Sequence, residues 1–195
     1  DRHLAQLPLE GLDVRLMADW PNTLHWPAAA VVSTGSVLNC YPAQATTGTN
    51  KTFTALAWPG ANRALYIPIQ IETTVTAYQI VIANGATVAG TVDVGIYDVL
   101  GNRLVSVGPT SMAGASVDQL FDITDTLLTP GVYYLAMAAS DATATFFAAD
   151  PNFTALRASG MQQQASAATL PSTATFAVLA SGYMPLIGLT TRTVV

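Results

Sequence analysis

The stretch at 91–107, TVDVGIYDVLGNRLVSV, limits what this chain can fold into more than any other. One face of the extended chain carries the β-branched residues Val92, Val94 and Ile96, because successive side chains of a strand point to opposite faces. A Gly-Asn turn and a second apolar run follow. The pattern predicts a β-hairpin with one apolar face. It places Asp93 and Tyr97 on the other face, where solvent or a neighbouring subunit would meet them.

Other runs of the same kind predict further strands at 65–71, 75–83, 118–124, 132–138, 143–148, 176–179 and 185–189. Pro68 has no N–H to donate, which favours a sheet edge or a bulge. The run at 75–83 is apolar on both faces, as expected of a strand covered on both sides. In the strand at 118–124, Leu120 is expected to be buried, with Phe121 and Ile123 less regularly so. About nine strands and no long helix predict an all-β fold, an antiparallel β-sandwich of jelly-roll-like type.

The strand pattern also suggests how the chain is divided. Residues 1–27 carry leucines at irregular spacing, broken by proline and glycine, and are expected to form an extended N-terminal arm. Residues 28–195 are expected to form a single β-sandwich domain, with its core motif at 61–148. Within this domain, residues 39–62 are predicted to connect rather than to pack, and residues 158–175 to form a long loop.

Composition indicates a surface that other subunits cover. Hydrophobic residues make up 51% of the chain and charged residues only 10%, against roughly 25% charged in an average protein. The longest strictly apolar run, at 132–139, is far shorter than the ~20 residues of a membrane-spanning helix, so no membrane insertion is expected. No signal peptide is evident near the start, and we expect a protein made without export. Large apolar surfaces of this kind mark interaction sites, so an assembly is predicted.

Several function classes find no support in the sequence. Seven Lys and Arg residues against twelve Asp and Glu give no basic stripe, which argues against nucleic-acid binding. Cys40 is the only cysteine, so the chain can form no internal disulfide. There is no G-x-S-x-G motif, and the only histidines are His3 and His25, so we expect no catalytic residue and no enzyme activity. A carboxylate pair for glycan hydrolysis stays a less favoured alternative.

Two groups of side chains are candidate binding sites. Aspartates of two neighbouring strands could form a calcium site: Asp93, Asp98, Asp118, Asp122 and Asp125. Exposed strand and turn positions explain these aspartates better. No metal or cofactor is therefore predicted. Three tryptophans, each directly followed by a proline, could act as glycan-stacking platforms or pack at a subunit interface: Trp20, Trp26 and Trp58.

The core motif is also where a family resemblance lies. VDVGIYD at 92–98, GNRLV at 101–105 and PGVYYLA at 130–136 are its most specific pieces. Over residues 61–148 the chain resembles a family of virion proteins of tailed bacteriophages and prophages, encoded among their tail-fibre-like genes. The resemblance implies a structural or adsorption component of a phage particle, without a catalytic residue. The same motif also looks like the sandwich core of carbohydrate-binding modules, which is an analogy of fold.

The expected function follows from the resemblance and the composition together. We expect a structural component of a bacteriophage virion, associated with the capsid as a decoration protein, with the baseplate or with the tail fibre. Its expected partners are other virion proteins and further copies of itself, with a trimer favoured, and neither nucleic acid nor membrane. The alternative is a carbohydrate-binding host-recognition module whose partner is a host cell-surface glycan.

Overall fold

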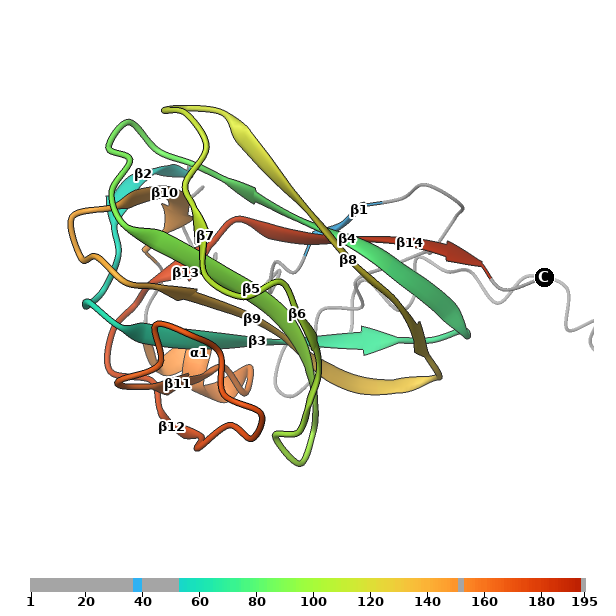
Figure 1. Cartoon of the computed structure of the whole chain (residues 1–195). Coiled ribbons are helices and arrows are strands. Elements are labelled where there is room, and N and C mark those ends of the chain that lie inside the picture. Colours follow the sequence, from blue (N-terminus) through green and yellow to red (C-terminus); the bar gives the residue numbers. More distant parts are fainter. Residues whose placement is uncertain (1–36, 40–52, 151–152, 194–195) are drawn as a thin grey trace, which may run out of the picture.

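The computed structural model describes residues 37–39, 53–150 and 153–193, and these form an antiparallel β-sandwich (Figure 1). The predicted arm at residues 1–27 lies outside this part. The four-stranded sheet has the order β1 (Val37–Asn39), β14 (Ile187–Thr193), β4 (Val75–Ala83) and β8 (Asp118–Leu128). The seven-stranded sheet has the order β12 (Ala177–Val178), β11 (Gln162–Gln164), β3 (Arg63–Ile71), β9 (Gly131–Ala139), β5 (Thr91–Asp98) and β6 (Arg103–Ser106), with β7 (Thr110–Ser111) also on β5. A small third sheet joins β13 (Met184–Pro185), β10 (Thr145–Ala149) and β2 (Thr54–Ala57), and the single helix of the described residues is α1 (Phe153–Ala158).

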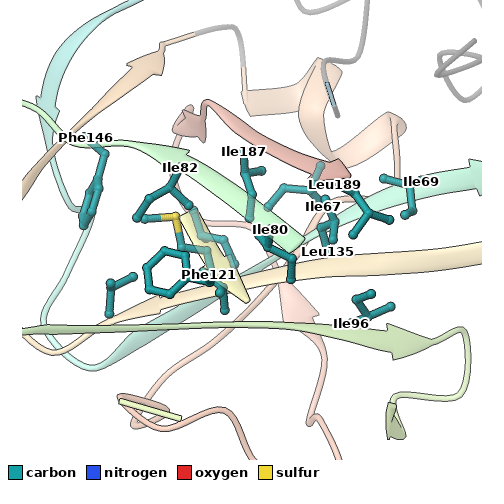
Figure 2. Packing of buried hydrophobic residues seen from close by; sticks show 14 of the residues in the cluster. Ile67, Ile69, Ile80, Ile82, Ile96, Phe121, Leu135, Phe146, Ile187 and Leu189 are labelled. Carbon is teal, nitrogen blue, oxygen red and sulfur yellow. The ribbon is translucent and has the colours of Figure 1, made fainter. Parts of the chain in front are cut away.

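The main core lies between the two large sheets, and alternation along the strands creates it. Every second residue of β3 and β5 points inward, and the inward residues of β4, β8 and β14 meet them (Figure 2). The largest fully buried members of this core include Ile67, Ile69, Ile80, Ile82, Ile96 and Phe146. The chain passes repeatedly from one sheet to the other, from β3 to β4, back to β5 and again from β7 to β8 and β9. The predicted all-β fold with antiparallel sheets packed as a sandwich is therefore confirmed.

The predicted hairpin is β5 and β6, and its turn is built by one carboxylate. Asp98 accepts hydrogen bonds from the N–H groups of Leu100 and Asn102, at 2.9 and 2.8 Å, and from the Asn102 side chain. Gly101 has φ of 86°, a conformation that glycine adopts without strain. Partial burial acts to raise the pKa of Asp98, but these hydrogen bonds together lower it below its usual value. The turn therefore favours the ionised carboxylate.

The largest correction concerns the outer face of the seven-stranded sheet, the face turned away from the four-stranded sheet. Residues 158–175 do not form a free loop: they contain β11, and a stretch that we call the strap, residues 160–176, lies over this face (Figure 1, orange and red). Asp93 and Tyr97, predicted to face solvent or a partner, are fully buried beneath it. The strap brings its own apolar side chains, Ala167 and Leu170, and thus makes a second core.

The structure differs from the sequence prediction in several smaller points of strand pairing, strand length and burial. Residues 39–62 do more than connect, because β2 pairs with β10 within this range. Strand β8 is longer than predicted, and Leu120 is 60% exposed while Phe121 and Ile123 are buried. The second face of β4 is only half-buried. The pairing of β3 with β11 ends at Tyr66, before Pro68. Among the described residues β3 is therefore paired at Pro68 only with β9, which fits the predicted edge position of this proline.

No helix in the described ranges is long and apolar enough to cross a membrane.

Candidate functional site

The outer face of the seven-stranded sheet is the most distinctive surface of the described residues. Its side chains form rows across β5, β9 and β3, because antiparallel register sets the rows side by side: Asp93, Ala138 and Ala64; Gly95, Ala136 and Tyr66; Tyr97, Tyr134 and Pro68. The strap covers the first two rows, with Ala167 and Leu170 packed on them. The third row lies at the boundary of the strap. Beyond it, Val132 pairs with Gln70 and both side chains stay half-exposed.

Hydrogen bonds from the sheet hold the strap at its middle. The Leu170 N–H donates to Asp93 Oδ2 at 2.9 Å, and the Tyr97 hydroxyl donates to the Pro171 carbonyl. Arg103 donates twice, from its side chain to the Leu170 carbonyl and from its backbone N–H to the Ser172 carbonyl. Because the sheet partner in each of these bonds lies on β5 or β6, the hairpin predicted from the sequence is what positions the strap.

Two further bonds hold its ends. The Tyr66 hydroxyl donates to Gln164 Oε1 at 2.9 Å, and the Ala174 N–H donates to the Gly101 carbonyl at 2.7 Å. The strap is thus fixed at both ends as well as in the middle, and this fixes the position of Phe176 at its end.

Asp93 is the most unusual charged residue of this face. Its side chain is fully buried, and Oδ1 has no hydrogen-bond partner among the described residues. Burial raises the pKa of Asp93, while the Leu170 N–H and the nearby Arg103 charge act to lower it. The net direction is upward, so the fold favours the neutral carboxyl more than water does. The group has no access to solvent, which makes it an anchor for the strap.

Four aromatic rings continue from this anchor to the surface. Tyr66 packs edge-on against Tyr97 at 5.2 Å and against Phe176 at 5.1 Å between ring centroids. Phe176 in turn meets Tyr134 at 4.9 Å with 48° between the ring planes. Burial raises the pKa of Tyr66 to about 12 and raises that of Tyr97 further, so both hydroxyls stay neutral donors at ordinary pH.

The cluster ends in an open, uncharged surface. We call its four half-buried residues the open end: Gln70, Val132, Tyr134 and Phe176. Partial burial raises the pKa of Tyr134. Neither the Tyr134 hydroxyl nor the Gln70 amide has a hydrogen-bond partner among the described residues. Such a surface can offer apolar contact together with neutral donors and acceptors.

The sequence-predicted tryptophan site is not assembled here. Trp58 is 2% exposed, and its ring packs edge-on against Phe146 and Tyr183, each at 5.4 Å. Its indole N–H donates to the Arg63 carbonyl at 3.0 Å. Trp58 therefore offers no exposed ring for a sugar and serves as a core residue. Trp20 and Trp26 lie outside the described residues, as do His3, His25 and Cys40.

The five aspartates considered for calcium lie in different environments. Asp93 is buried under the strap and Asp98 belongs to the hairpin turn, whereas the other three are exposed on β8: Asp118, Asp122 and Asp125. Asp125 pairs with Arg192, whose guanidinium also lies over the Tyr78 ring. Within the described ranges no group of three His, Cys, Asp or Glu side chains could hold a metal ion.

Exposed apolar side chains lie on two other parts of the surface. At the turn of the hairpin, Val99 and Leu100 are 53% and 79% exposed. On the outer face of the four-stranded sheet, Leu120 and Leu127 of β8 are 60% and 59% exposed. Each of these pairs exposes apolar side chains to water, and the β8 pair lies among the exposed carboxylates of Asp118, Asp122 and Asp125.

The arginines of the described residues are all engaged in internal contacts. Arg103 and Arg157 donate to backbone carbonyls, Arg63 to Gln163, and Arg192 to Asp125. Phosphate and carboxylate ligands are usually recognised by arginine forks that are free to reach them. The described surface is therefore poorly suited to an anionic ligand.

The sequence held one signal for the open end that was missed. Tyr133 and Tyr134 are adjacent in a strand, so their side chains point to opposite faces of the sheet. Tyr133 shares the inward face with Leu135, and Tyr134 lies on the outer face. The sequence around Phe176 gave no such signal, because Phe176 contacts Tyr134 only once the strap lies over the sheet.

No model of a known protein family matches the chain, and neither a curated protein nor a solved structure is similar enough to count as a match. What the protein does is therefore inferred from its own residues.

Proposed function

We propose that this chain is a non-enzymatic structural subunit of a tailed-bacteriophage virion, made in the bacterial host and assembled with other virion proteins. The phage particle is proposed from the resemblance of residues 61–148, whose motifs VDVGIYD and GNRLV lie in the β5–β6 hairpin. The position in the particle is the capsid, the baseplate or the tail fibre. Copies of the chain associate with one another, with a trimer favoured.

The observation that carries the proposal is the pair of exposed leucines on β8. Leu120 and Leu127 directly precede the core residues Phe121 and Leu128. Because successive side chains of a strand point to opposite faces, the two leucines are exposed on the outer face. Across the sheet, Leu120 lies opposite Val81, which extends the apolar surface onto β4. Burying apolar area of this kind against another subunit contributes roughly 25 cal/mol per Å². Asp118, Asp122 and Asp125 are also exposed on β8, so a partner that covers the two leucines must leave these carboxylates hydrated or pair them.

Sedimentation of the full chain tests the proposal. The wild type is expected to sediment as an oligomer and to bind purified particles of its phage. The double variant Leu120→Ser/Leu127→Ser is expected to shift the chain toward monomer, because each serine places a hydroxyl where the partner's apolar surface would be. Val88→Ser is the matched control, since Val88 is also exposed, at 39%, but lies on the connection between β4 and β5. Its oligomeric state should equal that of the wild type.

Two results would count against the proposal. A wild-type chain that stays monomeric at all concentrations and does not bind particles contradicts both assembly and a virion role. An oligomer unaffected by the double variant places the interface elsewhere than on β8. Thermal unfolding of each variant shows whether the sandwich is intact.

A carbohydrate-binding adsorption module is the second candidate, and one observation favours it. The open end presents two neighbouring aromatic rings on a sheet face, at 4.9 Å from each other. Trp58 does not contribute, because it is buried in the core. A glycan array probed with the full chain tests this candidate, and an array without any binding would remove it.

A further inference from the structure

We propose that the open end, formed by Gln70, Val132, Tyr134 and Phe176, is a binding site for a neutral sugar ring. This goes beyond the assembly proposed above, and it rests on the second candidate function, to which it gives a place in the fold. The site lies on the outer face of the seven-stranded sheet, next to the strap, and shares no residue with the β8 surface.

The rings are held in place before any ligand arrives. Phe176 packs against both Tyr66 and Tyr134, and Tyr66 is fixed by its hydrogen bond to Gln164. Tyr97 packs edge-on against Tyr66, and its hydroxyl donates a hydrogen bond to the Pro171 carbonyl. A ligand that meets rings already in position loses less free energy to ordering than one that must fix mobile side chains.

The polar groups of the open end match the hydroxyls of a sugar. The Tyr134 hydroxyl can donate and accept, and the Gln70 amide carries both an acceptor oxygen and two donor hydrogens. These groups have no other partner among the described residues. A sugar ring has an apolar C–H face and a rim of hydroxyls, so it can use the aromatic rings and the polar groups together.

The charges around the site select a neutral ligand. Two arginines reach the strap, and both are already bonded, Arg103 to the Leu170 carbonyl and Arg63 to Gln163. Asp98, at the end of β5, is occupied by its own turn. Since the described residues offer no free cation here, a carboxylate or sulfate on the sugar would lose its hydration and gain no partner from them. Neutral oligosaccharides are therefore favoured over acidic ones.

The experiment measures binding of soluble oligosaccharides to the full chain by calorimetry and by saturation-transfer NMR. The probes are neutral gluco-, galacto- and manno-oligosaccharides, with sialylated and uronic-acid oligosaccharides for comparison. Binding of at least one neutral probe is expected, with no binding of its acidic counterpart. Tyr134→Ala is expected to weaken binding about fivefold, since a stacked aromatic pair contributes about 1 kcal/mol beyond its burial. Tyr134→Phe is expected to weaken it less, because it removes only the hydroxyl.

Tyr78→Ala is the matched control. Tyr78 is also half-buried, but it lies on the outer face of the four-stranded sheet beside Arg192. Its replacement should leave saccharide binding unchanged. Phe176→Ala tests the second ring, and its unfolding temperature is measured because Phe176 also touches Tyr66. If that variant does not fold, the two Tyr134 variants decide.

Three outcomes overturn the site. Absence of binding to every neutral probe overturns it, and so does a loss with Tyr78→Ala equal to the loss with Tyr134→Ala. If Tyr134→Ala instead dissociates the oligomer in sedimentation, the open end is an interface between copies. The two proposals can fail separately, because assembly is read from Leu120 and Leu127 and sugar binding from Tyr134.

Discussion

Asp93 shows how strongly one residue of this fold depends on what covers it. It lies on β5 between Val92 and Val94, which face the main core, and it faces the strap instead. Its carboxyl accepts one hydrogen bond from the Leu170 N–H and has an unpaired second oxygen. Because burial raises the pKa of this group above the usual 3.8, the folded state binds its proton more tightly than the unfolded state does.

The sign of the pH effect follows from this shift. A raised pKa contributes stability that is complete below the unfolded value of about 3.9 and is lost as the pH rises through the folded value. Asp93→Asn keeps an acceptor for the Leu170 N–H and carries no charge. Its unfolding free energy, relative to the wild type, should therefore increase from pH 3 toward pH 7, as measured by urea denaturation at each pH.

The control for this prediction is Asp118→Asn, which removes an exposed carboxylate at the start of β8. This variant is measured at the same pH values, so that the general effect of removing one carboxylate can be separated from the effect of Asp93. A constant difference between Asp93→Asn and the wild type across the range would show that Asp93 does not titrate differently in the fold.

At the scale of elements, the strap depends on a glycine in β5. A Cβ at Gly95 would lie 2.5 Å from the Val105 carbonyl oxygen, 2.9 Å from Ser106 Cβ and 3.2 Å from Leu170 Cδ1. The Val105 carbonyl and Ser106 of β6, and next to them Leu170 of the strap, therefore occupy the space where any other residue would have a side chain, so both β6 and the strap approach β5 closely here because residue 95 is glycine.

Gly95→Ala is expected to lower the unfolding free energy by about 1–3 kcal/mol, the usual cost of overpacking a filled site. The strap should also loosen, so the pKa of Tyr66 should fall from about 12 toward 10, measured by ultraviolet absorbance of the tyrosines during alkaline titration. Gly131→Ala is the matched control, because its Cβ would meet nothing closer than 3.7 Å at the start of β9. Equal stability of the two variants would contradict the role of Gly95.

At the scale of the whole molecule, apolar contact outweighs charge. The ion pair seen among the described residues, Arg192 with Asp125, has side chains that are 55% and 53% exposed. Exposed pairs of this kind contribute about 0–1 kcal/mol. Assembly through Leu120 and Leu127 would likewise use apolar burial rather than charge.

Self-association of the full chain should therefore respond to salts in a particular way. Raising sodium chloride to about 1 M, where charges are screened beyond ~3 Å, should not dissociate the oligomer. Ammonium sulfate should strengthen it, because this salt favours apolar burial. Sedimentation equilibrium in both salts measures the effect, with Leu120→Ser/Leu127→Ser as the variant that should lose the sulfate response. Dissociation by sodium chloride would show that ion pairs hold the copies together.

Local patterns were enough to predict much of the fold. The alternation of Val92, Val94 and Ile96 predicts both a strand and its buried face, because the period of a strand is a property of neighbouring residues. The turn at Asp98 and Gly101 is equally local, since its hydrogen bonds span four residues at most. The sandwich follows from many such strands, each with an apolar face to cover.

Only the tertiary structure decided what covers the outer face of the seven-stranded sheet. Asp93 and Leu170 are 77 residues apart in the chain, and no periodicity in the strap indicates where it lies. For the same reason Trp58 was open to two interpretations until its contacts with Phe146 and Tyr183 placed it in the core. The sequence determines the faces of each strand, because these depend on alternation. Which faces stay exposed depends on contacts between distant segments, and these form only when the whole chain folds.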